Sequence, residues 1–278
     1  MCHLTQTRLP SFFLQDFSVV AHPDTHQPWY VPRSLTSPHS PPTAPRPDVA
    51  ARGTAVGGNA WVLARHALLR GTVVRGSGLP TSPARRLMRH RQLTWRAWPK
   101  MVHWRPDIDG FVLELMRRRV VEGLTYLCGR QRGYLVATAG WSDAVMKKKQ
   151  VGAFLWADRD GAEAEMGGPG AEMGGSGAAA AALEPGEFAT VDVREGKRRL
   201  PVYNLPVLLG PAHVRALRTK MPKIFDAAVV VLKDKRRTVD VRLRLWKLQG
   251  FHAQYEQIEA LHAPRAAAAA KQTRGMSN

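Results

Sequence analysis

The chain has 278 residues and carries 41 Lys and Arg against 22 Asp and Glu, a formal net charge of +19. This excess favours polyanionic partners, nucleic acid first among them, and argues nothing about fold. Two cysteines are too few for a disulfide framework, and no apolar run reaches the roughly 20 residues of a transmembrane helix. With 20 Pro and 24 Gly besides, we expect one modest domain of a soluble, intracellular-type protein.

The N-terminal segment, residues 1–58, is rich in proline and contains few large apolar residues. Proline disfavours both helix and sheet pairing, and a chain with little apolar surface to bury does not offset the entropy lost on ordering. We therefore predict that residues 1–58 are disordered.

Residues 59–106 form a basic block, because the stretch 51–106 contains ten Arg, one Lys and no acidic residue. Ser82 followed by Pro83 is a typical helix start. The predicted helix is amphipathic. Its apolar stripe contains Leu87, Met88, Trp95 and Trp98. Its basic side contains Arg85, Arg86, Arg89 and Arg96.

Residues 107–262 alternate between helical and strand patterns and form the predicted folded domain. A Gly- and Ala-rich loop interrupts it at 158–187, and a disordered tail, 263–278, follows it. The predicted helices are 110–127, 211–220 and 238–261. The predicted strands are 134–140, 151–157, 188–193, 199–205 and 227–233. The turn between the third and fourth strands indicates a hairpin. The expected fold class is α+β, with a small, hairpin-rich, mostly antiparallel sheet and three to four helices.

Two of these helices carry apolar residues at helical spacing, so their inner sides can be predicted. For the helix at 110–127 the inward residues are Val112, Leu115, Met116, Val120, Leu124 and Leu127. For the helix at 238–261 they are Val241, Leu245, Leu248, Tyr255 and Ile258.

Asp107 and Asp109 come closest to a catalytic pair. They lie directly before the predicted helix at 110–127, so capping of its N-terminus explains them better than acid–base chemistry. The other carboxylates are scattered singly, so no catalytic residue is nominated. An enzyme or enzyme subunit whose site assembles from distant residues is the main alternative to a binding protein.

The histidines and cysteines do not predict a metal site. His66, His90 and His103 have no cysteine or acid at ligand spacing, so neither a metal nor a cofactor is expected. Cys128 ends an apolar helix and fits a small core residue better than a nucleophile.

Two arginine-rich segments predict a nucleic-acid site, since arginine neutralises phosphates and tryptophan stacks on unpaired bases. Trp95 and Trp98 share the apolar stripe, so we favour core packing for them, and Trp104 is a further stacking candidate. The predicted binding residues are Arg85, Arg86, Arg89 and Arg96 in the first segment. In the second they are Arg236, Arg237, Arg242 and Arg244.

The expected function is therefore non-catalytic binding of RNA or of an RNA–protein particle, of the ribosome-associated or assembly-factor type. A scaffold for an acidic protein partner is a further alternative, and a membrane surface is the least favoured partner. Residues 51–75 have the Arg-bearing, acid-free composition of a mitochondrial presequence, although about 50 residues precede them. A mitochondrial location is expected, with nuclear or cytoplasmic location as the alternatives.

Overall fold

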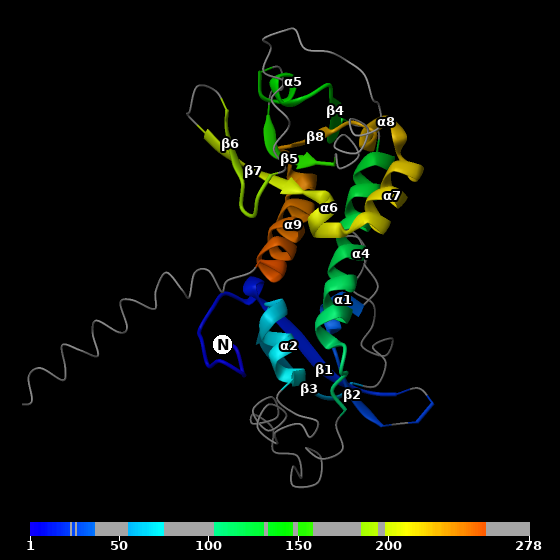
Figure 1. Ribbon diagram of the computed structural model, residues 1–278. Helices are drawn as coiled ribbons and strands as arrows, with labels where there is room; N and C mark the ends of the chain where they lie inside the picture. The colour runs from blue at the N-terminus through cyan, green and yellow to red at the C-terminus, as the bar shows by residue number, and fades with distance from the viewer. Residues whose placement is uncertain are drawn as a thin grey trace, which may run out of the picture.

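The structure is a computed structural model that describes residues 1–36 apart from 23 and 26, and residues 55–74, 103–130, 133–146, 150–157, 185–193 and 198–253. The long helix α4 (Ile108–Gly129) runs from a three-stranded sheet near its first turn to a five-stranded sheet near its last (Figure 1). Helices together with mixed, mostly antiparallel strands confirm the predicted α+β class. Of the helices in these ranges, none is long and apolar enough to cross a membrane.

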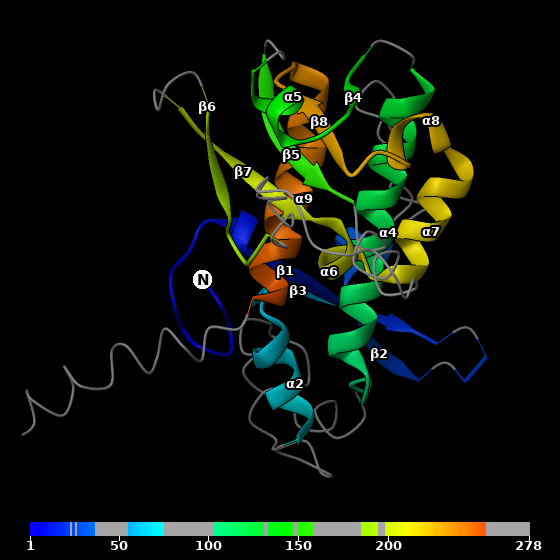
Figure 2. The same cartoon turned by 45° about the horizontal axis from the view of Figure 1, so that its top comes forward.

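The five-stranded sheet contains β4 (Leu135–Thr138), β5 (Val151–Trp156), β6 (Thr190–Val193), β7 (Arg198–Asn204) and β8 (Val229–Lys233). Its strand order is β4-β8-β5-β7-β6, and every pair is antiparallel except β5 with β7. All five strands overlap the predicted ones. The predicted hairpin is confirmed as β6–β7, which stands at the edge of the sheet (Figure 2).

Both faces of this sheet are covered. On one face Ala153, Leu155, Val230 and Leu232 belong to the large core that α4 and α9 (Val239–His252) also line. On the other face Phe154 and its neighbours form a small separate core with α5 (Trp141–Met146). A strand buried on both faces is apolar throughout, which is why β5 reads as the continuous run VGAFLW.

The helices match the predicted inner sides. All six residues predicted to face inward from the 110–127 helix are buried on α4. On α9, Val241, Leu245 and Leu248 are buried as predicted, whereas Tyr255 and Ile258 lie outside the described residues. The predicted helix at 211–220 is α7 (Pro211–Lys220).

The expected three to four helices are an undercount for the described part of the chain. Helices of nine residues or more are α2 (His66–Val74), α4, α7 and α9. Helices of four to six residues are α1 (Arg33–Thr36), α5, α6 (Leu205–Leu209) and α8 (Pro222–Phe225). Such short helices fall below the length at which a hydrophobic period can be recognised.

The prediction that residues 1–58 are disordered is wrong for their described part. The three-stranded sheet consists of β1 (Leu14–Ala21), β2 (Pro28–Val31) and β3 (Ala55–Leu63), in the order β2-β1-β3. Phe17 and Tyr30 are among the most deeply buried side chains of the protein. The composition of the whole segment is dominated by the prolines between 38 and 47, and it concealed the apolar strand LQDFSVVA.

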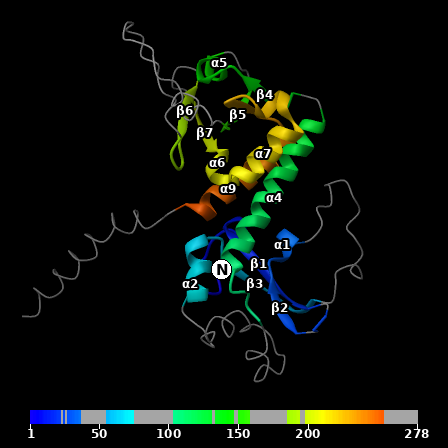
Figure 3. The same cartoon turned by 45° about the vertical axis from the view of Figure 1, so that its right-hand side comes forward.

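Helices α1 and α2 lie on either side of the first turns of α4, next to the three-stranded sheet (Figure 3). A buried polar cluster fixes α1 to β1. The Asp16 carboxylate accepts hydrogen bonds from the Ser34 amide (3.2 Å), from the Ser34 hydroxyl and from the Gln15 side-chain amide (2.8 Å). Three donors satisfy this buried carboxylate, as a charge removed from water requires.

Lys247 joins α9 to the three-stranded sheet. Its Nζ donates a hydrogen bond to the Leu14 carbonyl oxygen at 3.0 Å. Burial lowers the pKa of Lys247, and the negative charge of Asp16 opposes that shift. A lysine in this position holds the N-terminal sheet against the last helix.

Helices α4 and α9 pack antiparallel and in close contact at Gly123. A Cβ atom on Gly123 would lie 2.7 Å from Cγ2 of Val241, a β-branched side chain that is itself buried. One turn away on each helix, Arg244 Nη1 donates to the Arg119 carbonyl oxygen at 2.9 Å. Glycine is therefore required at position 123 for this close approach.

The crossing can be tested with Gly123→Ala. We expect the free energy of unfolding to fall by about 1–3 kcal/mol through overpacking, which outweighs up to about 1 kcal/mol of gained helix propensity. Gly110→Ala is the matched control, because a Cβ there meets nothing within 4 Å. In urea denaturation Gly110→Ala should be neutral or stabilising. Equal effects of the two substitutions would show that the close approach is absent.

Candidate nucleic-acid interface

The eight arginines predicted to bind nucleic acid fall into groups that differ in their structural environment. Arg85, Arg86, Arg89 and Arg96 lie outside the described residues, as do Trp95 and Trp98. Trp104 is partly buried and packs against Phe17 and Tyr30, with ring centroids 5.2 and 5.5 Å apart, so the structure gives it a packing role. The second segment, by contrast, is described completely, and it divides into two functional groups.

Arg242 and Arg244 are engaged inside the fold. Arg242 Nη1 lies 2.6 Å from Asp234 Oδ1, and its guanidinium lies against the backbone of β5 at Gly152. Arg244 Nη2 lies 2.8 Å from Asp240 Oδ2. These two arginines, both among the nucleic-acid residues predicted from sequence, hold α9 against β5 and α4.

Asp234 is the carboxylate that neutralises Arg242 and a second arginine, Arg198. Besides Arg242 it accepts a hydrogen bond from Arg198 Nη2 of β7 at 3.0 Å. Arg198 first, and then the charge of Arg242, lower the pKa of the Asp234 carboxyl. One carboxylate therefore joins β7 to α9 through two guanidinium groups.

Arg236 and Arg237 are exposed at the start of α9, in the 3-10 turn η5 (Arg236–Thr238). Arg237 Nη1 lies 3.3 Å from the hydroxyl oxygen of Tyr126, near the end of α4. The Arg130 guanidinium lies 4.9 Å from the centre of the same ring. We call Tyr126, Arg130, Lys235, Arg236 and Arg237 the Tyr126 cluster.

The Tyr126 cluster is positioned by the helix crossing and by one buried threonine. The antiparallel crossing at Gly123 brings the end of α4 beside the start of α9. The Thr238 hydroxyl is fully buried, donates to the Lys233 carbonyl oxygen (2.6 Å) and accepts from the Lys235 amide (3.1 Å). This arrangement fixes the turn that presents the three consecutive cations.

The Tyr126 cluster carries an excess of positive charge. Among the residues that the structure describes, none of its four cations forms an ion pair with a carboxylate. Lys235, Arg236 and Arg237 also lie at the positive end of the α9 dipole, which disfavours cations there. The neighbouring Arg130, and then Arg237, lower the pKa of the Tyr126 phenol. A bound anion would relieve this concentration of positive charge.

The Tyr126 ring itself is 44% exposed, although it lies on an otherwise well-packed helix. An exposed ring between guanidinium groups can stack on a planar base, while the guanidinium groups contact phosphate. Sequence analysis missed Tyr126 and Arg130. The available signal was that Tyr126 falls outside the apolar stripe that continues to Leu127.

The candidates for catalysis and metal binding keep structural roles. Asp107 occupies the N-cap position of α4, but its carboxylate pairs with Arg105 at 2.7 and 2.9 Å instead of capping the helix. Asp109 lies 3.4 Å from His66 Nε2. Burial raises the pKa of Cys128 to about 11, as for an inert core thiol. The described ranges contain no cluster of three metal-ligating residues.

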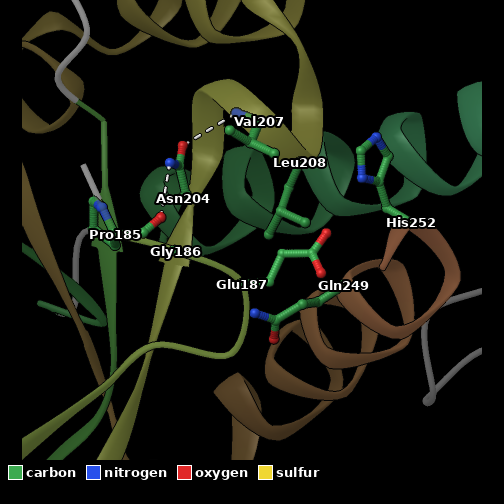
Figure 4. A pocket seen from close by; sticks show the side chains of 8 residues that line it. All are labelled: Pro185, Gly186, Glu187, Asn204, Val207, Leu208, Gln249 and His252. Atoms are coloured by element: carbon green, nitrogen blue, oxygen red, sulfur yellow. Dashed lines mark hydrogen bonds between the residues drawn. The ribbon is translucent and has the colours of Figure 1, made fainter. Parts of the chain in front are cut away.

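A pocket lies at the opposite end of α9 from the Tyr126 cluster. It has a volume of about 330 Å³ and is lined by residues 185–187, by the end of β7, by α6 and by the last turn of α9. Figure 4 shows the side chains of Glu187, Gln249 and His252 around it.

Comparison with protein families, with curated protein sequences and with solved structures finds no match to this chain.

The division of the arginines predicts unequal effects of their removal on the free energy of unfolding. Arg242→Ala should lower the free energy of unfolding by about 1 kcal/mol, because it leaves Asp234 with one partner and uncovers the strand at Gly152. Arg236→Ala should change it by less than about 0.5 kcal/mol, as at an ordinary surface site. Chemical denaturation measures both. A larger loss for Arg236→Ala would contradict the assignment.

Proposed function

We propose that the protein binds RNA without catalysis, alone or as part of an RNA–protein particle, and that the Tyr126 cluster is a principal contact. The observation that carries this proposal is an exposed tyrosine ring held between two guanidinium groups that have no carboxylate partner among the described residues. This combination matches the chemistry of an unpaired nucleotide, which has a flat base beside a phosphate.

Single-stranded RNA fits the cluster better than a duplex. A duplex stacks its bases internally and presents phosphates and hydroxyl groups, so it would use the guanidinium groups and leave the tyrosine ring without a role. An unpaired base provides a free face for the Tyr126 ring regardless of its identity. We therefore propose binding that depends mainly on charge and stacking at this cluster.

The net charge of +19 supports the same class of partner. An acidic protein would also be attracted by the cations of the Tyr126 cluster, and the tyrosine separates the two hypotheses, because stacking contributes only where a base is bound. A mitochondrial location, suggested by the composition of residues 51–75, is part of the proposal as the compartment of such an RNA.

Salt dependence is the first test of the proposal. We expect affinity for a single-stranded RNA oligonucleotide to fall with a log–log slope near about −4 if five or six phosphates are contacted, at about 0.7 per contact. Fluorescence anisotropy over a range of KCl concentrations measures the slope. A flat dependence, or no binding at low salt, would refute RNA binding.

The second test locates the contact. Arg130→Gln with Arg237→Gln should reduce the slope by about 1.4, and Tyr126→Ala should weaken binding by about 1–3 kcal/mol while Tyr126→Phe retains most of it. Arg118→Gln with Arg215→Gln is the matched control, since it removes the same charge from exposed positions on α4 and α7. If this control weakens binding equally, the Tyr126 cluster is not a specific contact.

A further inference from the structure

The pocket at the C-terminal end of α9 has polar side chains without partners. Gln249 is only 6% exposed, yet its side-chain amide has no hydrogen-bond partner among the described residues. Glu187 is an exposed residue that lines the same pocket and has no ion-pair partner within those ranges. The amide of Gln249 and the carboxylate of Glu187 are therefore both available to a ligand in this pocket.

The loop that forms the mouth of the pocket is strained. The Ala189 amide donates to the Gly186 carbonyl oxygen at 3.3 Å and closes a four-residue turn, in which Phe188 has a φ of 56°. A turn with positive φ at its third position strongly favours glycine. Instead, this position has an aromatic side chain that is 44% exposed. Strain of this kind gathers at ligand sites.

The charge of the pocket restricts the ligand. Burial, and then the charges of Arg117 and His66, lower the pKa of His252, while the charge of Glu187 opposes that shift. Glu187 is therefore the only residue of the lining that carries a formal charge at neutral pH. A carboxylate can only accept hydrogen bonds, so its best partner presents two adjacent N–H donors. The remaining walls, Pro185, Val207 and Leu208, are apolar and suit a flat ring.

Among the four RNA bases, guanine alone has two adjacent donors, N1–H and the N2 amino group, on its Watson–Crick edge. Adenine presents one donor and one acceptor there, cytosine presents one donor followed by two acceptors, and uracil places one donor between two acceptors. Beside these donors guanine has the O6 acceptor, which the Gln249 amide can serve. The pocket volume of about 330 Å³ lies within the range of small-ligand sites.

We propose that this pocket binds an unpaired guanine, with Glu187 accepting from N1–H and N2–H and Gln249 donating to O6. In an RNA strand, the exposed Phe188 beside the pocket would stack on the adjacent base. The source of the guanine is a free nucleotide or a nucleotide of an RNA strand. Only the second source rests on the proposed RNA binding.

The probe for the pocket is GMP, compared with AMP, CMP and UMP by calorimetric titration of the full chain. We expect GMP to bind about tenfold or more tighter than the others, the discrimination typical of one bidentate contact. IMP, which lacks the amino group, should bind more weakly than GMP. Equal affinity for all five nucleotides, or no binding of GMP, overturns the proposal.

Glu187→Gln should abolish the preference for GMP, because an amide presents a donor to one of the two guanine donors. Glu122→Gln is the matched control, an exposed glutamate of α4 that pairs with Arg119 outside the pocket. It should bind GMP as the unaltered chain does. Retention of the preference in Glu187→Gln overturns the assignment.

Phe188→Gly separates a ligand role from a structural one. Glycine relieves the positive φ, so the melting temperature should rise, whereas loss of the stacking ring should weaken binding of a single-stranded RNA that contains one G by about tenfold. A merely structural phenylalanine would give lower stability and unchanged binding by the folded protein, which would overturn its role.

Two RNA strands distinguish the sources of guanine, and they also separate the guanine proposal from the proposal of RNA binding. One strand contains only C and U, the other is the same strand with a single G, and the affinity of the protein for each is measured. If the strand is the source, the G raises affinity, and Glu187→Gln removes that gain. The Arg130→Gln and Arg237→Gln variant should still bind GMP, since the Tyr126 cluster lies at the other end of α9. Binding of GMP without binding of either strand would refute RNA binding and support the pocket for free guanine nucleotides.

Discussion

The close approach of α4 and α9 at Gly123 is the constraint on which the rest of the structure depends. These two helices cover one face of the five-stranded sheet, and α4 also extends to the three-stranded sheet, so their separation sets the width of the large core. The same crossing aligns Arg244 with Arg119 on one side of Gly123 and Arg237 with Tyr126 on the other. A single position without a side chain thus determines both the packing of the core and the geometry of the exposed Tyr126 cluster.

Charge in this protein is divided by the positions of a few acids. Asp234 and Asp240 neutralise the arginines that face inward from α9, and no acid among the described residues pairs with those at its start. The result is a helix whose beginning carries unbalanced positive charge and whose last turn lines a pocket with an unbalanced carboxylate. Opposite ends of α9 therefore suit opposite chemistries, phosphate at the start and N–H donors at the end.

Hydrophobic period predicted α4, α7, the described part of α9 and all five strands of the larger sheet, because their apolar residues recur at regular spacing over a whole element. It failed for β1, where Gln15 and Asp16 are buried between apolar residues and the surrounding prolines dominate the composition. For the site, the high density of basic residues in the sequence predicted the segment at the start of α9. It could not predict that Arg242 would pair with a carboxylate and Arg237 would not, because that depends on which acids lie nearby in the fold. Tyr126 meets Arg237, and Glu187 meets Gln249, only through contacts between distant parts of the chain, which spacing along the sequence cannot reveal.

The hydrogen bond from Lys247 to the Leu14 carbonyl oxygen joins residues separated by 233 positions. During synthesis the three-stranded sheet leaves the ribosome long before α9 does, by roughly 10–40 s at the usual elongation rates of about 5–20 residues per second. Throughout that interval β1 lacks its contact with the last helix, although α2 and α4, which belong to the same core, have already been synthesised. The N-terminal sheet therefore reaches its final packing only when the C-terminal helix arrives.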